Sequence, residues 1–225
     1  MTQSGVAENY LNIFNRVKEL NPNATLVAVS KTKPIELLQE AFNSGCRTFG
    51  ENYVDEIVTK GPLLPDAKFH MIGHLQANKV NKVCKIPNLA MIETIDSDHL
   101  ADKVNNSWKF DEPLPVMIQV NTSDEPQKNG VQVGENLTNL AQHIINNCPK
   151  LKFTGLMTIG EIGESQRDFQ TLIDAKNALA AQLNVDPSSL KLSMGMSADY
   201  ELALQMGSDY VRVGSSIFGA REYKH

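Results

Sequence analysis

The sequence predicts a single α/β domain, residues 1–225, folded as a (β/α)8 TIM barrel with one extra helix at its N-terminus. Short apolar runs rich in β-branched residues alternate with longer helical patterns along the whole chain. Such alternation implies a parallel sheet. Eight strand–helix units in roughly 200 residues favour a small closed barrel over the alternative, an open doubly wound sheet.

The strands are predicted from apolar runs bounded by turn residues. These runs cover residues 25–30, 47–50, 68–73, 90–95, 115–121, 152–158, 191–195 and 210–214. The leading helix is predicted over 6–20, where Leu11, Phe14 and Val17 recur at helical spacing. Further helices are predicted over 34–44, 52–60, 78–85, 165–183 and 197–206, and Asp96 or Ser97 is expected to cap another.

Composition narrows the classes of function. The formal net charge is −5 and Lys and Arg form no run, which disfavours nucleic-acid binding. Cys46, Cys84 and Cys148 lack CxxC spacing, so neither a disulfide framework nor a metal site is expected. The chain shows no signal-peptide pattern and no run of about 18 apolar residues, so we expect a cytoplasmic protein without a membrane span.

The loops after the last two predicted strands indicate an anion site. In TIM barrels these loops often bind phosphate together with the start of a short helix. Ser197 stands where a helix is predicted to begin, and Gly214 and Ser215 follow the eighth strand. Free N–H groups at a helix start attract anions. Taken singly, Ser197 is equally well explained as a helix cap, and Gly214-Ser215 as a tight turn.

Lys31 directly follows the first strand and should point into the mouth of the barrel. A partly desolvated lysine near another cation has a lowered pKa, which makes its amine a better nucleophile toward an aldehyde. Arg212, between two valines of the eighth strand, could be that cation; a structural salt bridge is the alternative. Lys33 is a rival to Lys31, and a solvated surface lysine is the plain alternative for either.

Other polar residues give weaker indications. His70 and His74 span a strand and its turn, so shared metal coordination is not expected. Three acids stand near strand ends without an obvious partner: Glu51, Glu93 and Asp199. Two polar loops, 123–130 and 160–166, should lie at the active face as lids or as ordinary solvated loops.

Six sequence blocks carry a resemblance to a known family. They are VAVSKTKP, FGENYV, HMIGHLQANK, GLMTIG, LSMGMSADYELA and VRVGSSIFGAR, in order along nearly the whole chain. Together they resemble the pyridoxal phosphate homeostasis proteins, also called the YggS or PROSC family, which are similar in fold to the N-terminal barrel of alanine racemase. The resemblance implies that pyridoxal 5′-phosphate (PLP) is the cofactor.

The resemblance also implies roles for single residues. Lys31 would be the Schiff-base lysine. Arg212 would face the pyridine nitrogen and disfavour its protonation, which weakens the electron-sink character of the cofactor. Asn52 would lie beside the cofactor. The phosphate would be held by Ser197, Gly214 and Ser215.

Three functions remain open from the sequence. The first is a carrier or buffer of PLP in vitamin B6 homeostasis, with PLP-dependent apo-enzymes as candidate acceptors and no catalysis of its own. The second is a PLP-dependent racemase or lyase with weak activity. Racemisation removes a proton on one face of the cofactor and delivers one on the other, and Tyr53 and Tyr200 are weak candidates for the residue opposite Lys31. The third is a Schiff-base aldolase acting on a sugar phosphate. Because little chain follows Gly214, we expect no second racemase domain and a monomer.

Overall fold

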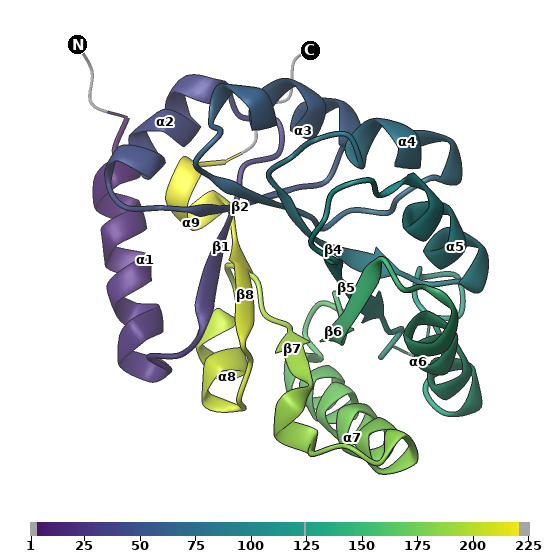
Figure 1. Cartoon of the computed structure of the whole chain (residues 1–225). Coiled ribbons are helices and arrows are strands. Elements are labelled where there is room, and N and C mark those ends of the chain that lie inside the picture. The colour runs from purple at the N-terminus through teal and green to yellow at the C-terminus, as the bar shows by residue number, and fades with distance from the viewer. Residues whose placement is uncertain (1–3, 124, 221–225) are drawn as a thin grey trace.

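The structure, a computed structural model, describes residues 4–123 and 125–220 and contains a closed parallel barrel (Figure 1). The strands follow one another in chain order, and β8 pairs with β1 to close the sheet. They are β1 (Thr25–Val29), β2 (Thr48–Glu51), β3 (Lys68–Met71), β4 (Leu89–Ile95), β5 (Leu114–Gln119), β6 (Leu151–Met157), β7 (Lys191–Ser193) and β8 (Tyr210–Val213). The predicted barrel is therefore confirmed, and the open sheet is excluded.

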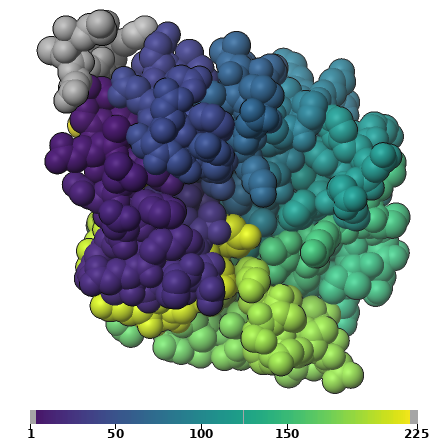
Figure 2. All heavy atoms as spheres, turned by 60° about the vertical axis from the view of Figure 1, so that its left-hand side comes forward, coloured from purple at the N-terminus to yellow at the C-terminus, as the bar shows by residue number. Residues whose placement is uncertain are grey.

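Helices surround this barrel, one or more after each strand. They are α1 (Val6–Leu20), α2 (Ile35–Asn43), α3 (Val54–Lys60), α4 (Val80–Val83), α5 (Asp98–Ser107), α6 (Glu135–Asn147), α7 (Ser165–Leu183), α8 (Tyr200–Gln205) and α9 (Ser215–Phe218). Short 3-10 turns occur at η1 (Gly61–Leu63), η2 (Ala77–Lys79) and η3 (Pro187–Ser189). The extra helix α1 packs against α2, α8 and α9, so purple and yellow segments meet in Figure 2.

One predicted helix start was wrong. The helix expected over 197–206 begins at Tyr200 instead. The Asp199 carboxylate accepts the Met196 N–H at 2.7 Å, which holds residues 196–199 as a turn. Ser197 therefore lies in a loop before α8 and does not cap that helix.

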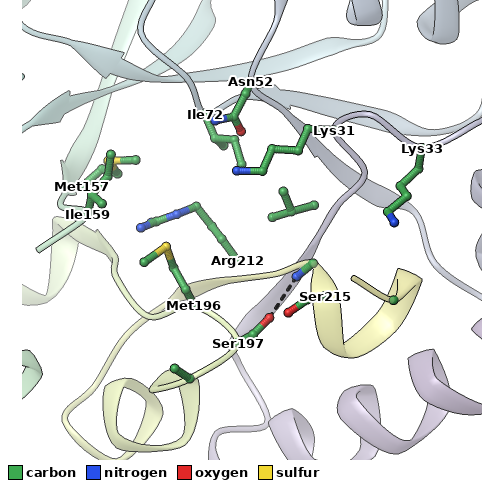
Figure 3. A pocket seen from close by; sticks show the side chains of 14 residues that line it. Lys31, Lys33, Asn52, Ile72, Met157, Ile159, Met196, Ser197, Arg212 and Ser215 are labelled. Atoms are coloured by element: carbon green, nitrogen blue, oxygen red, sulfur yellow. Dashed lines mark hydrogen bonds between the residues drawn. The ribbon is translucent and has the colours of Figure 1, made fainter. Parts of the chain in front are cut away.

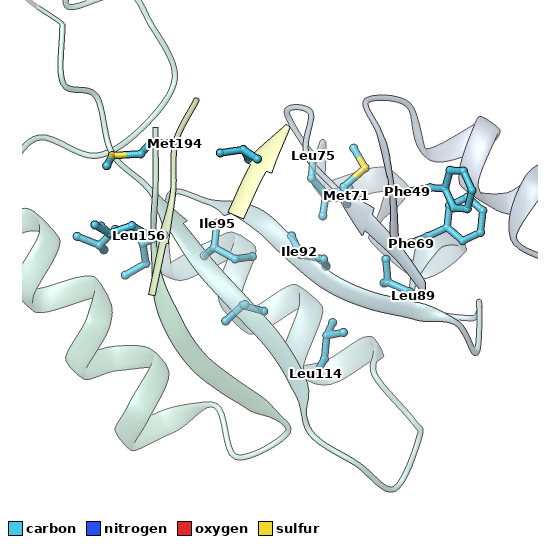
Figure 4. Close-up of a cluster of buried hydrophobic side chains, with 14 of the residues drawn as sticks. Phe49, Phe69, Met71, Leu75, Leu89, Ile92, Ile95, Leu114, Leu156 and Met194 are labelled. Carbon is cyan, nitrogen blue, oxygen red and sulfur yellow. The ribbon is translucent and has the colours of Figure 1, made fainter. Parts of the chain in front are cut away.

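Successive side chains of a strand point alternately outward to the helices and inward to the barrel axis, so the apolar residues form two separate clusters. In β8, Val211 and Val213 pack into the main core between sheet and helices. Figure 4 shows part of this core, with Phe49, Phe69 and Ile92 among its members. The barrel interior takes the alternate residues and holds a small separate cluster, made of Met91, Met117 and Met157 with Tyr210 against it.

The rest of the barrel interior is polar. Inward-facing positions near the strand ends carry Glu93, Gln119, Ser193 and Arg212, all buried. Buried polar groups must find partners inside the protein, so a hydrogen-bonded network is expected beneath the barrel mouth. Within the described ranges, no helix combines the length and apolar character that crossing a bilayer requires.

Candidate functional site

A cavity of about 370 Å³ opens at the carboxyl ends of the strands (Figure 3). It is walled by residues from strand ends far apart in the sequence, as expected for a barrel mouth. All six residues predicted from the sequence line it: Lys31, Asn52, Ser197, Arg212, Gly214 and Ser215. The fold therefore brings together side chains from β1, β2, β7 and β8 that the sequence could only assign to separate loops.

The two rival lysines lie differently. Figure 3 shows Lys31 reaching into the same space as Arg212, whereas Lys33 stands to one side. Both line the cavity, but the Lys33 Nζ donates a hydrogen bond to the carbonyl of Ala220 at 2.8 Å. This contact holds the Lys33 amine at the cavity wall.

The loops after β7 and β8 meet at the opposite side of the cavity. The Ser197 hydroxyl accepts the Gly214 N–H at 3.3 Å across 17 residues of sequence. Gly214 is also close to β1, because a Cβ there would lie 3.1 Å from the Val29 carbonyl oxygen. Ser215 begins α9 beside them. Two hydroxyls next to a helix start form a donor set suited to a small anion.

Arg212 forms the buried floor of the cavity, with only 3% of its surface exposed. Its Nη2 donates to the Thr158 carbonyl at 2.7 Å, and its Nη1 donates to the Ser193 hydroxyl at 2.5 Å. Burial lowers its pKa, yet a guanidinium starts from so high a value that it keeps its proton. The site therefore holds a fixed positive charge below its centre.

Glu93 supplies the charge that balances Arg212. It is fully buried, and its Oε1 lies 3.9 Å from the Arg212 Nη1, farther than a direct hydrogen bond. Burial alone would raise its pKa. The hydrogen bonds and charges of His70, Arg212 and Ser193 outweigh burial, and the pKa of Glu93 lies below its ordinary value. His70 Nδ1 contacts the Glu93 Oε2 at 2.8 Å. Glu93 is thus an internal counter-ion and not a loose acid.

The remaining sequence candidates lie outside this cavity. Asp199 accepts hydrogen bonds from the Met196 N–H and the Ser165 hydroxyl, so its role is structural. Tyr200 is buried in the core. Tyr53 is exposed, and with His74 it lines a neighbouring hollow; among the described residues, Asn52 alone lines both this hollow and the main cavity.

The apolar walls of the cavity were not predicted. They are Val29, Ile72, Met157, Ile159 and Met196. Apolar residues at strand ends read as core in a sequence, and nothing local distinguishes those that face a cavity. The partial exposure of Ile159 and Met196, 47% and 39%, marks them as walls at the rim.

A second cluster of possible ligands lies on the helical shell. Donor atoms of Asp102, His143 and Cys148 lie within 4.8 Å of one another. His143 Nε2 contacts the Asp102 carboxylate at 2.6 Å, and the Cys148 thiol is buried against the same carboxylate at 3.7 Å. The hydrogen bond between His143 and Asp102, which joins α5 to α6, accounts for this arrangement.

Comparison with known proteins assigns the fold to a class of domains. Residues 4–222 match the family described as alanine racemase, N-terminal domain. Alanine racemase from Bacillus anthracis has a similar structure, with a TM-score of 0.73 over 96% of this chain and 57% of that chain, at 16% identity. At that identity the likeness concerns the fold alone.

More similar relatives narrow the class. The chain belongs to the family of proteins named pyridoxal phosphate homeostasis protein. The human member is 48% identical over 212 residues, which cover 88% of this chain and 77% of that protein, and the Schizosaccharomyces pombe member is 48% identical over 206 residues, covering 88% and 85%. The structure of PipY from Synechococcus elongatus with PLP bound has a TM-score of 0.79 at 28% identity, covering 95% of this chain and all of that one.

Proposed function

We propose that this chain binds PLP as a Schiff base on Lys31 and acts in intracellular PLP homeostasis as a carrier or buffer. One observation carries the proposal: a strand-end lysine, a buried arginine and two hydroxyl-bearing loops line the same cavity. The names of the relatives and the PLP-bound PipY structure support the choice of cofactor. When bound, PLP supplies an aldehyde that condenses with an amine and loses water, and a ring that can accept electrons.

Each residue has a part in this proposal. Ser197, Gly214 and Ser215 receive the phosphate, and Lys31 provides the amine that condenses with the cofactor aldehyde. Asn52 lies beside the ring, and Arg212 faces the ring nitrogen. Because the guanidinium is already positive, it disfavours a proton on that nitrogen, and the ring withdraws electrons less strongly.

The cavity walls favour a carrier over a racemase. Racemisation needs a proton removed from one face and delivered to the other. Of the described residues that line the cavity, none is a tyrosine, a histidine or a carboxylic acid. Lys31 could serve one face, and Tyr53 and Tyr200 lie elsewhere. The second candidate, a weak PLP-dependent racemase or lyase, would have to take its other proton donor from Lys33, which bonds to the Ala220 carbonyl, or from outside this wall.

The proposal also covers the oligomeric state of the protein, its location and its partners. Residues 1–225 form one PLP-binding domain that works as a monomer in the cytoplasm. Its partners are PLP and PLP-dependent apo-enzymes that accept the cofactor. A sugar-phosphate aldolase without cofactor is the third candidate, and a bound chromophore on the purified protein would argue against it.

The Schiff base is tested by trapping it. Wild-type protein mixed with PLP should show a visible absorbance band that borohydride removes, and intact mass should rise by one reduced PLP. Peptide mapping should find the added mass on Lys31. Lys31→Ala should lose both signals because it removes the amine that reaches into the space beside Arg212, whereas Lys33→Ala should keep them. Loss in Lys33→Ala with retention in Lys31→Ala would overturn the assignment.

A further inference from the structure

The residue after Lys31 has an unusual backbone. Thr32 has a φ of 65°, in the left-handed region that a β-branched residue rarely adopts. The Lys33 N–H donates to the Ser30 carbonyl at 3.1 Å, so Lys31 and Thr32 are the two central residues of a tight turn. A turn with positive φ at its third position normally uses glycine. Such strain persists only where neighbouring groups enforce it.

One enforcing contact comes from α3. The Thr32 N–H donates to the Glu56 Oε1 at 2.8 Å. This bond fixes the peptide group immediately after Lys31. The bond crosses 24 residues of sequence, so it belongs to the tertiary structure and not to the turn itself.

A second set of contacts fixes the residue before Lys31. The Ser30 hydroxyl donates to the Glu51 Oε1 at 2.6 Å, and the Lys60 Nζ donates to the Ser30 carbonyl at 2.8 Å. Ser30 and Glu51 are fully buried. The chain is thereby anchored on both sides of Lys31 by residues of β2 and α3.

Lys60 links Glu51 and Glu56, the two carboxylates that hold the chain on either side of Lys31. Its Nζ lies 2.8 Å from the Glu51 Oε1 and 2.8 Å from the Glu56 Oε1, and the residue is only 6% exposed. Burial raises the pKa of Glu51 although Lys60 opposes the shift. Among the described residues, Glu51 Oε2 and Glu56 Oε2 are the buried side-chain atoms without a hydrogen-bond partner. Buried charges and unpaired oxygens of this kind call for an explanation beyond stability.

We propose that Glu56, Lys60 and Glu51 form a clamp that positions Lys31 for attack on the cofactor aldehyde. They are positioning residues, because none of them lines the cavity. The clamp holds the strained Lys31-Thr32 turn, so the backbone from which the Lys31 side chain extends into the cavity is kept in place. This inference rests on the proposed role of Lys31. It adds Glu56 and Lys60, which the sequence did not single out, and gives partners to Glu51, one of the acids that stood near a strand end without one.

The clamp is tested by the rate at which PLP is captured. Stopped-flow absorbance would follow the visible band after mixing with PLP, and borohydride-fixed mass would give the captured fraction. Glu56→Ala should slow capture roughly tenfold, since the left-handed turn loses its enforcing contact. Glu56→Gln keeps an oxygen acceptor and should restore most of the rate. Asp55→Ala, which removes a carboxylate from the same first turn of α3, is the matched control and should leave the rate unchanged.

A rescue experiment separates positioning from general damage. Glycine adopts positive φ without a side-chain penalty. Thr32→Gly should therefore recover most of the rate lost in Glu56→Ala, although it restores no contact with α3. A loss of rate that Thr32→Gly leaves untouched would contradict the clamp.

A third readout needs no cofactor. Amide hydrogen exchange at Thr32 should be slow in the wild-type protein alone and clearly faster in Glu56→Ala. Fast exchange at Thr32 in the wild type would overturn the proposal even if Glu56→Ala did not fold.

Trapping of PLP in the wild-type protein distinguishes the proposed function from the clamp. Failure to trap PLP on Lys31 refutes the proposed function, whereas normal trapping with an unaffected Glu56→Ala rate refutes only the clamp.

Discussion

At the scale of single residues, the site combines one fixed charge with adaptable hydroxyl groups. Arg212 donates hydrogen bonds to the Thr158 carbonyl and the Ser193 hydroxyl, so its guanidinium is held in position before a ligand binds. Ser197 lies on the loop before α8 and Ser215 lies at the exposed start of α9. A rigid guanidinium at the ring and rotatable hydroxyls at the anion would orient an elongated ligand in one direction.

The hydroxyl groups predict how the cofactor phosphate contributes to affinity. A hydrogen bond to a charged group contributes about 1.5–3 kcal/mol, so Ser197→Ala combined with Ser215→Ala should weaken PLP binding roughly a hundredfold or more. Equilibrium titration of the absorbance band would measure the change. Pyridoxal, which lacks the phosphate, should bind the double variant and the wild type alike. Ser216→Ala, exposed and absent from the cavity wall, is the control. Equal losses for PLP and pyridoxal would refute the anion site.

At the scale of elements, the sequence predicted a helix start correctly where neighbouring residues alone determine it. The cap residue predicted at position 96 or 97 is Ser97, whose hydroxyl accepts the Leu100 N–H at 3.1 Å. The start predicted at Ser197 failed because two contacts override the local pattern. The Asp199 side chain fixes the preceding turn, and Gly214 in another loop uses the Ser197 hydroxyl. A serine before an apolar run predicts a cap only when no distant partner competes for it.

The Ser97 cap gives a stability prediction for α5. Ser97→Ala removes an acceptor for an N–H group in the first turn and should lower the free energy of unfolding by about 1 kcal/mol. In a chain of this size that corresponds to a fall in Tm of about 2–4 °C. Ser97→Asp keeps an acceptor and should stay near the wild type in thermal unfolding followed by circular dichroism. An unchanged Tm in Ser97→Ala would mean that packing alone holds this helix end.

At the scale of the whole molecule, the sequence predicted which strand ends form the barrel mouth. It did not predict which buried polar side chains form hydrogen bonds with one another. Alternation of strands and helices implies the closed barrel, and the barrel implies that strand ends converge. The partnership of Glu93 with Ser193 spans 100 residues, and Lys60 reaches Ser30 from the end of α3. No periodicity encodes such pairings, because they depend on the radius of the barrel and on which inward side chains face one another.

The reduced cysteines of the core make the stability of the whole chain sensitive to alkaline pH. Burial raises the pKa of the Cys46 and Cys84 thiols from 9.0 to about 12. Above pH 9 the unfolded chain therefore loses thiol protons that the native chain keeps. Because the native state then binds more protons, its stability falls as the pH rises, and the contribution present below pH 9 is lost toward pH 12.

Urea unfolding at pH 7, 8.5 and 10 measures this dependence. Each thiol should remove about 1.4 kcal/mol of stability per pH unit once the unfolded thiol ionises. Other groups titrate in this range too, so the informative quantity is the difference between variants. Cys46→Ala and Cys84→Ala should start less stable at pH 7, because each leaves a small cavity. They should then lose stability less steeply than the wild type between pH 8.5 and 10. Parallel losses in all three proteins would show that these thiols ionise in the native state as readily as in the unfolded one.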